Sequence, residues 1–212
     1  MTFIQNIVDI IRLKSLKNYL NFNPTALRLI LNFLSLFEYG NRNSVLQSNL
    51  LRFIGCNVGK NVHIGSNIYI YRAKNLTLGD NVAIGDNNVF MCWNKIDIKS
   101  LSFTSVDVKF VAGTHNTFDY SNVTDNQEII IEEGVWLGAS STLFGGVKVG
   151  KGSIVGGGAI CLPKTYKEFC IYAGVPAKEI KQREPAKNIC QPVVYKLEEI
   201  INEQNCSDNA RI

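Results

Sequence analysis

Residues 131–161 read IEEGVWLGASSTLFGGVKVGKGSIVGGGAIC, and an apolar residue returns in this stretch at every sixth position. The apolar positions are Ile131, Leu137, Leu143, Val149, Val155 and Cys161. A small or β-branched residue follows four positions after each of the first five, at Val135, Ser141, Val147, Ser153 and Ala159. An α-helix repeats every 3.6 residues and a half-buried strand every two. A period of six predicts instead a parallel β-helix built from hexapeptide repeats.

Earlier parts of the chain keep the same period. The residues are Val58, Ile64 and Ile70, then Leu78, Ile84 and Phe90, and more loosely Ile98, Thr104 and Phe110. Three hexapeptides make one triangular turn of about 18 residues, and turns stack at about 4.8 Å. Gly-Lys-Asn at 59–61 and Gly-Asp-Asn at 79–81 and 85–87 fit the tight corners between its faces. A β-sandwich, the alternative, would alternate with period two and place its loops irregularly. The fold class is therefore an all-β solenoid.

The solenoid does not account for the whole chain of 212 residues. We expect an N-terminal helical cap over 1–53, the β-helix domain over 54–173 with a loop insertion near 111–130, and a C-terminal extension and tail over 174–212. The apolar run 26–37 is too short to cross a bilayer. It predicts an amphipathic helix, with Pro24 near its start and Gly40 past its end, that packs on the domain or lies on a membrane surface. A second helix is expected over 193–201.

Composition excludes several classes of protein. A net charge of +4 with no dense basic stripe argues against a nucleic-acid partner. The six cysteines are scattered without a C-x-x-C pair, so neither a zinc knuckle nor a disulfide framework is indicated. The N-terminus lacks the pattern of a signal peptide. We expect a cytoplasmic protein, with peripheral contact to the inner membrane left open.

The largest break in the repeat lies between Phe110 and Ile131. These residues lie 21 positions apart instead of 18, so at least three residues leave the prism there. Breaks in a regular scaffold are where functional loops tend to lie. The break contains His115, and histidine suits general-base catalysis near neutral pH. A surface histidine without a role is the alternative. The only other histidine, His63, falls in a regular repeat and is expected to be outward and solvated.

Four motifs carry a family resemblance: Gly-Thr-His at 113–115, Gly-Val-Trp-Leu-Gly-Ala at 134–139, Gly-Gly-Val-Lys-Val-Gly at 145–150 and Ala-Gly-Val-Pro-Ala-Lys at 173–178. In this order they resemble the hexapeptide-repeat acyltransferase superfamily. The likeness is to the maltose and galactoside acetyltransferases and the sugar O-acetyltransferases of capsule, colanic-acid and O-antigen clusters. It runs from about Gly55 to Arg183. It implies a left-handed parallel β-helix, acetyl-CoA as cosubstrate, no metal, and a homotrimer with active sites between neighbouring subunits.

The resemblance also implies roles for particular residues. His115 would be the catalytic base, oriented by a backbone carbonyl or a carboxylate, of which Asp119 is the nearest. A backbone N–H near Gly138 and Ala139 would stabilise the oxyanion. The coenzyme contacts would be Ala139, Gly157, Lys178 and Lys181, with Arg183 as a substitute and Lys164 in a stretch one residue longer than in relatives. The residues expected to line the substrate cleft are Trp93, Asn94, Asn116 and Trp136.

The expected reaction is transfer of an acetyl group to a sugar hydroxyl, in the biosynthesis of a surface polysaccharide such as O-antigen or capsule. The acceptor would be a sugar, a sugar nucleotide or a lipid-linked glycan. Two alternatives stay open: N-acylation of an amino-sugar nucleotide, and a non-catalytic solenoid that serves as an interaction protein. A γ-type carbonic anhydrase needs three histidine ligands for zinc, and the chain has two histidines.

Overall fold

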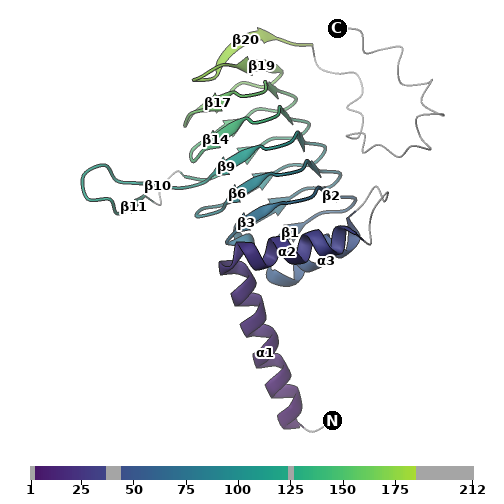
Figure 1. Cartoon of the computed structure of the whole chain (residues 1–212). Coiled ribbons are helices and arrows are strands. Elements are labelled where there is room, and N and C mark those ends of the chain that lie inside the picture. Colours follow the sequence, from purple (N-terminus) through teal and green to yellow (C-terminus); the bar gives the residue numbers. More distant parts are fainter. Residues whose placement is uncertain (1–2, 37–43, 124–126, 185–212) are drawn as a thin grey trace, which may run out of the picture.

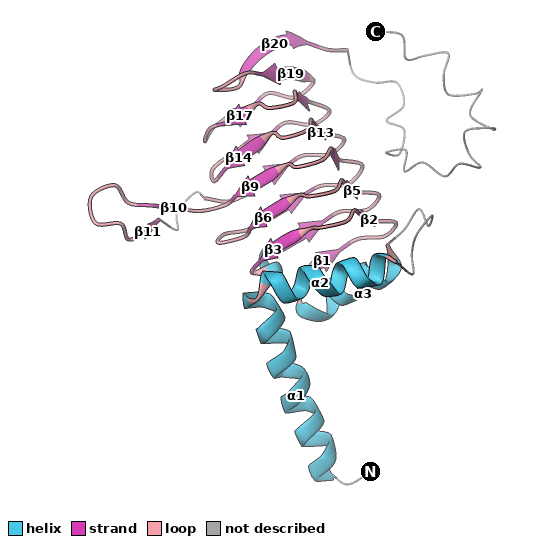
Figure 2. Ribbon diagram, viewed as in Figure 1, coloured by secondary structure: helices cyan, strands magenta, loops and turns pink. Residues whose placement is uncertain are grey.

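The computed structural model describes residues 3–36, 44–123 and 127–184. Three helices, α1 (Phe3–Phe22), α2 (Pro24–Ser35) and α3 (Val45–Ile54), lie at one end of a stack of short strands (Figures 1 and 2). A single 3-10 turn, η1 (Ala73–Asn75), joins two strands of the first turns. The strands form three parallel sheets, one on each face of a triangular prism. The predicted left-handed parallel β-helix is therefore confirmed.

Each sheet takes one strand from each turn. The first sheet holds β1 (Asn57–Val58), β4 (Leu76–Leu78), β7 (Ile96–Ile98), β12 (Ile129–Ile131), β15 (Lys148–Val149) and β18 (Thr165–Tyr166). The second holds β2 (His63–Ile64), β5 (Ala83–Ile84), β8 (Phe103–Thr104), β13 (Trp136–Leu137), β16 (Ile154–Val155), β19 (Cys170–Ala173) and β20 (Lys178–Gln182). The third holds β3 (Tyr69–Tyr71), β6 (Val89–Met91), β9 (Lys109–Val111), β14 (Thr142–Phe144) and β17 (Ile160–Cys161). We call the bends after these sheets the first, second and third corner.

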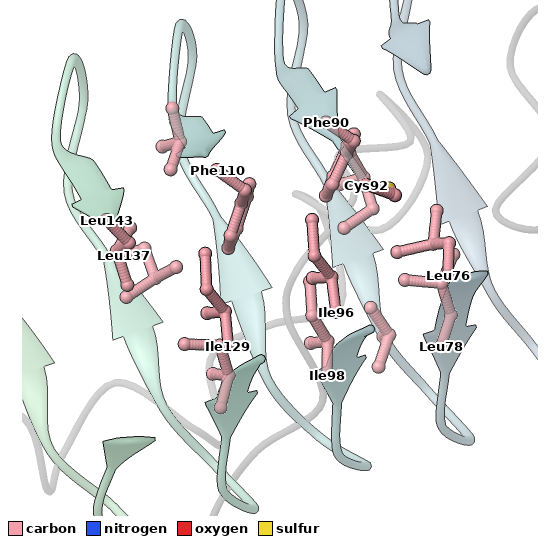
Figure 3. Packing of buried hydrophobic residues seen from close by; sticks show 14 of the residues in the cluster. Leu76, Leu78, Phe90, Cys92, Ile96, Ile98, Phe110, Ile129, Leu137 and Leu143 are labelled. Carbon is pink, nitrogen blue, oxygen red and sulfur yellow. The ribbon is translucent and has the colours of Figure 1, made fainter. Parts of the chain in front are cut away.

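The apolar residues that recur every six positions in the sequence form the core of the prism. Every apolar position of the repeat between Ile131 and Cys161 is buried. Side chains from successive turns stack inside the prism, as Figure 3 shows for Ile96 and Ile129. Phe90 and Phe110 stack with ring centroids 4.7 Å apart and nearly parallel planes. The hydrophobic effect thus acts on one column per face, so the core extends along the whole stack.

The corners use the residue types that the sequence suggested. Asn61, Asn81 and Asn87 have φ of 54°, 57° and 59°, in the left-handed region that asparagine tolerates better than most residues. Asn88 interrupts the apolar pattern, and it is fully buried. Its amide donates to the carbonyls of Gly85 and Ser105, in the same turn and the next. This polar side chain therefore joins two neighbouring corners from inside.

Helices α2 and α3 cover the first turn of the prism, whereas α1 extends away from it (Figure 1). Asn23 caps α2 by accepting a hydrogen bond from Ala26 N–H, and Pro24 stands in the first turn, as predicted. Leu27 and Leu31 of α2 are buried, which confirms that this helix packs on the domain. The predicted end at Gly40 lies outside the described residues. Among the helices that the structure describes, none is long and apolar enough to cross a membrane.

The other end is closed by an antiparallel strand. β20 pairs with β19 in the opposite direction, so the parallel stack stops there. Helix α3 ends at Ile54, and a bend over 174–177 joins β19 to β20. The domain boundaries at 54 and 174 stay predictions. The helix predicted over 193–201 lies outside the described residues.

The predicted insertion leaves at the third corner. At a regular third corner, the last residue of one strand, Met91, and the first of the next, Ile96, lie five positions apart. At the corner with the insertion, the corresponding residues Val111 and Ile129 lie 18 positions apart. Residues 113–123, here called the arm, contain the antiparallel pair β10 (Thr114–His115) and β11 (Asn122–Val123). Figure 1 shows the arm projecting sideways, away from the stacked turns.

Candidate active site

The orientation of His115 is fixed within the arm. The imidazole Nδ1 lies 2.9 Å from the carbonyl oxygen of Tyr120. A carbonyl oxygen only accepts, so Nδ1 carries the proton in this contact. The neutral ring then presents Nε2 as an acceptor, which is the form that a general base needs. His115 is exposed at its position in β10.

Asp119, the nearest acid to His115 in the sequence, is engaged elsewhere. Its Oδ1 accepts hydrogen bonds from the hydroxyl of Ser121 at 2.7 Å and from the backbone N–H of Ser121 at 3.0 Å. These bonds hold the pKa of the Asp119 carboxyl below its usual value. The orienting contact on His115 is thus made by the Tyr120 carbonyl, and Asp119 stabilises the turn that places this carbonyl.

The tip of the arm is a hydrogen-bonded turn with exposed aromatic side chains. Asn116 Oδ1 accepts from Phe118 N–H, and the backbone N–H of Asn116 donates to Ser121 O. Phe118 and Tyr120 are 93% and 79% exposed. Asn116 therefore shapes the turn around the histidine, and the arm presents apolar surface outward.

Two of the predicted substrate residues lie at the foot of the arm. A Cβ placed on Gly113 would come within 2.8 Å of the Cβ of Trp93, so the arm begins directly against this tryptophan. The backbone and side-chain amides of Asn94 donate to Ala112 O at 2.8 and 3.2 Å. Trp93 and Asn94 thus support the arm from the turn below.

Trp136 lies on a different face. Its ring stacks on Phe103 at 5.6 Å and its Nε1–H donates to Ser105 Oγ at 3.2 Å. It belongs to the second sheet, whereas the arm leaves after the third. Trp136 is 39% exposed, so its outer surface is open to another molecule.

Small residues line the second corner two residues after Trp136. Gly138 is buried, and a Cβ there would come within 2.6 Å of Gly157 N, so only glycine fits. Ala139 and Gly157 are exposed, and Ala139 O accepts from Gly158 N–H. Within the described part of the chain, the N–H groups of Ala139 and Gly157 donate to no protein acceptor. This corner offers open backbone donors with no bulky side chain to cover them.

The predicted cations are spread over three corners. Lys178 pairs with Ala173 beside the second corner, whereas Lys181 pairs with Ile171 towards the other end of β20. Arg183 donates to Gly152 O at the first corner, and Lys164 lies over the Tyr166 ring near the third. Lys178 therefore lies on the second-corner side of the stack, two strands beyond β16, which precedes Gly157. The roles of Lys164, Lys178, Lys181 and Arg183 in coenzyme binding stay predictions.

Three of the described cysteines are poor nucleophiles. Burial raises the pKa of the Cys56 thiol to about 12 and that of Cys161 to about 11. Burial also raises the pKa of Cys92, which precedes Trp93 at the foot of the arm. A thiol attacks as its thiolate, so none of these three is suited to forming an acyl-enzyme. Direct transfer between two bound substrates fits the residues better.

Comparisons with known proteins identify the family of the chain. The family described as hexapeptide repeat of succinyl-transferase matches residues 52–72 and 128–161. A putative colanic acid biosynthesis acetyltransferase, WcaF, of Escherichia coli is 30% identical over 134 residues, which cover 63% of this chain and 73% of the relative. A galactoside O-acetyltransferase of Lactococcus lactis is 34% identical over 119 residues, 56% of this chain and 51% of that one.

The solved structures show the same fold. A hexapeptide-repeat-containing acetyltransferase from Vibrio cholerae, complexed with acetyl coenzyme A, superposes with a TM-score of 0.62 at 18% identity. The match covers 80% of this chain and 99% of that one.

Proposed function

The chain belongs to the hexapeptide-repeat acetyltransferases, and on that premise we propose that it transfers the acetyl group of acetyl-CoA to a sugar hydroxyl. The observation that carries the proposal is the state of His115. Its Nδ1 is bound to the Tyr120 carbonyl, and its Nε2 is left to accept a proton. The same arm is anchored at Trp93 and Asn94, so the base stands on a supported element.

The reaction follows from this orientation. His115 Nε2 takes the proton of the acceptor hydroxyl while its oxygen attacks the thioester carbonyl carbon. The carbon–oxygen bond forms, the carbon–sulfur bond breaks, and the proton on Nε2 passes to the departing thiolate of coenzyme A. The products are the acetyl ester and free coenzyme A, with His115 neutral again. Nδ1–H stays on the Tyr120 carbonyl, which stabilises the charged imidazolium between the two proton transfers.

The second corner suits the coenzyme. The exposed backbone at Ala139 and Gly157 gives the pantetheine arm room and free N–H donors, one of which can meet the developing oxyanion. Lys178 lies at the same corner as a cation for a phosphate group. Trp136 walls this region from the second sheet.

A second copy of the chain completes the site. The arm leaves the third corner and projects away from its own prism, whereas Ala139 and Gly157 lie at the second corner (Figure 1). In a homotrimer, the arm of one protomer brings His115 to the second corner of its neighbour. The exposed Phe118 and Tyr120 then pack against that neighbour. We therefore place the active site between subunits.

The place of the reaction follows from the acceptor. We place it in the cytoplasm, in the assembly of a surface polysaccharide, with the WcaF-like relative as support. A lipid-linked glycan would bring the acceptor to the inner membrane surface. The exposed Leu13, Leu16 and Leu29, among the cations Lys14, Lys17 and Arg28, suit peripheral contact there.

The test is an acetyl-transfer assay with labelled acetyl-CoA on a panel of sugars and amino sugars. We expect acceptor-dependent release of coenzyme A and a labelled product. Mild alkali should remove the label, because it cleaves acetyl esters and leaves acetamides intact. An alkali-stable label on amino sugars would favour N-acylation instead. No transfer to any acceptor would leave the non-catalytic solenoid as the better description.

Ala139→Leu tests the second corner. The larger side chain would stand on the exposed surface assigned to the pantetheine arm, so we expect the KM for acetyl-CoA to rise about tenfold, the effect of losing roughly 1.4 kcal/mol of binding. Val106 occupies the equivalent position one turn below and is 48% exposed. Val106→Leu is the matched control and should leave the KM within about twofold. Equal effects in both variants would contradict the assignment.

A further inference from the structure

One arginine at the third corner is held among aromatic rings. The guanidinium carbon of Arg72 lies 4.3 Å from the centroid of the Trp93 ring, 5.5 Å from that of Tyr71 and 5.9 Å from that of Phe22. The Tyr71 and Trp93 rings lie 5.0 Å apart. Cation–π attraction to several rings holds a guanidinium in place. The charge of Arg72 is therefore positioned, unlike that of a flexible surface lysine.

The backbone around Arg72 is fixed as well. Its φ is 55°, a left-handed conformation that residues other than glycine seldom adopt. Its N–H donates to Asn21 O at 2.9 Å, and Asn21 Oδ1 accepts from Lys74 N–H at 2.8 Å. The end of α1 thus holds the corner in this unfavourable conformation, and the side chain of Arg72 is directed onto Trp93.

Within the described residues no anionic group pairs with Arg72, whose side chain lies against aromatic rings. Its Nε is buried without a hydrogen-bond acceptor, and no carboxylate lies within ion-pair distance of the guanidinium. A neighbouring cation, Lys95, is paired with Asp97 at 3.0 Å. Buried polar groups normally have a partner. The planar fork of an arginine fits a carboxylate or a phosphate, in two parallel hydrogen bonds.

This cluster lies below the arm. Tyr71, Met91 and Val111 are in register in successive turns, so the residues after them stack along the third corner. Trp93 lies between Arg72 and Gly113, and it touches both. Two turns of the prism separate Arg72 from Gly113, about 10 Å. A sugar bound across Trp93 would therefore reach from Arg72 to the base of the arm that carries His115.

We propose that Arg72, stacked on Trp93, binds an anionic group of the acceptor, a carboxylate or a phosphate, so that the acceptor is a negatively charged sugar. The inference rests on the proposed function, because it names the acceptor class of the same reaction. Trp93, 38% exposed, gives the sugar ring an apolar surface, and Arg72 binds the charge. The two together select an acidic sugar over its neutral analogue.

The first experiment compares acceptors that differ only in charge. Glucose, galactose and mannose are each assayed beside their uronate and their 1-phosphate, at constant ionic strength. We expect the wild type to prefer one anionic form by about 10- to 100-fold in kcat/KM, the usual effect of a hydrogen bond between charged groups. The preferred form distinguishes a carboxylate from a phosphate. Equal use of neutral and anionic forms would overturn the proposal.

Variants separate recognition from folding. Arg72→Gln should remove the preference through the KM for the anionic acceptor, while kcat/KM for the neutral analogue stays within about threefold. Arg72→Lys should keep part of the preference for the anionic acceptor, because lysine has the charge of arginine but not its planar pair of donors. Lys74→Gln removes an equal charge two residues away and should keep the preference. If Arg72→Gln lowers kcat/KM equally for the anionic and the neutral acceptor, Arg72 has only a structural role.

A binding measurement decides the anion site without catalysis. The chain has two tryptophans, so Trp136→Phe leaves Trp93 as the only one. Titration with glucuronate or glucose 1-phosphate should change its fluorescence, whereas methyl glucoside should not, and Arg72→Gln should abolish the change. No response to either anion refutes the anion site. If the anions bind but no sugar is acetylated, the proposed function fails and the site stands.

Discussion

Replacement of His115 by alanine should lower kcat for acetyl transfer by about 10²- to 10⁴-fold, the usual contribution of a positioned general base. The side chain is exposed on the arm, so the change leaves the core of the prism intact. The KM for acetyl-CoA should stay within about threefold, because the coenzyme is assigned to the second corner. Steady-state kinetics with the best acceptor of the panel measure both quantities.

Two controls make this result specific. His63→Ala removes the other histidine, which lies on β2 and is half-buried instead of solvated as expected, and should change kcat by less than about threefold. Asp119→Asn should also stay within about tenfold, since Asp119 bonds to Ser121 and not to the imidazole. A loss in Asp119→Asn as large as that in His115→Ala would show that the carboxylate orients the base. Full activity of His115→Ala would refute the mechanism.

Phe110→Ala should cost about 3–5 kcal/mol of the free energy of unfolding, the range for large aromatic truncations in a core. Phe110 is fully buried and stacks on Phe90 in the preceding turn, so truncation leaves a cavity inside the prism. This is a large share of the usual total of about 5–15 kcal/mol. Urea unfolding followed by circular dichroism measures the loss.

A graded substitution tests the cause. Phe110→Leu keeps most of the apolar volume and should cost about 1 kcal/mol. If both variants unfold at the same urea concentration as the wild type, the column of inward side chains does not carry the stability. A cost that follows the removed volume supports the packing of the core.

Much of the fold was predictable because its signal is local. Residues six positions apart occupy equivalent places on successive faces of the prism. The burial of Leu137 and Leu143 could therefore be predicted from their spacing alone. Asn61 and Gly59 mark a corner for different reasons: Asn61 adopts a left-handed backbone, and a Cβ on Gly59 would come within 2.6 Å of the backbone nitrogen of Asp80. The insertion could be predicted for the same reason, because the six-residue spacing of apolar residues is interrupted after Phe110.

The candidate site was predictable only in part. The six-residue spacing placed His115 in the insertion, but it did not identify the group that orients the imidazole. Every residue has a backbone carbonyl, so nothing in the sequence distinguishes that of Tyr120 from those of its neighbours. Asp119 was predicted instead, because it is the nearest residue with a carboxylate. The coenzyme cations were placed by resemblance, and the structure separates Lys178 from Arg183 by the length of β20.

Arg72 shows what sequence reasoning missed. It interrupts no motif, and its aromatic neighbours lie 50 positions earlier, directly before it and 21 positions later in the chain. Only the register of β3 with β6 and the end of α1 bring Phe22, Tyr71 and Trp93 around it. Of the three rings around Arg72, only that of Tyr71 is close to it in the sequence.

The sequence by itself determined the solenoid, its corners and the place where the arm leaves, because each depends on spacing along one turn. The tertiary structure decided which groups meet: the carbonyl that orients His115, the open amides at Ala139 and Gly157, and the arginine stacked on Trp93. These contacts join residues of different turns or bends of the arm. They depend on register and side-chain direction, which a six-residue period leaves open.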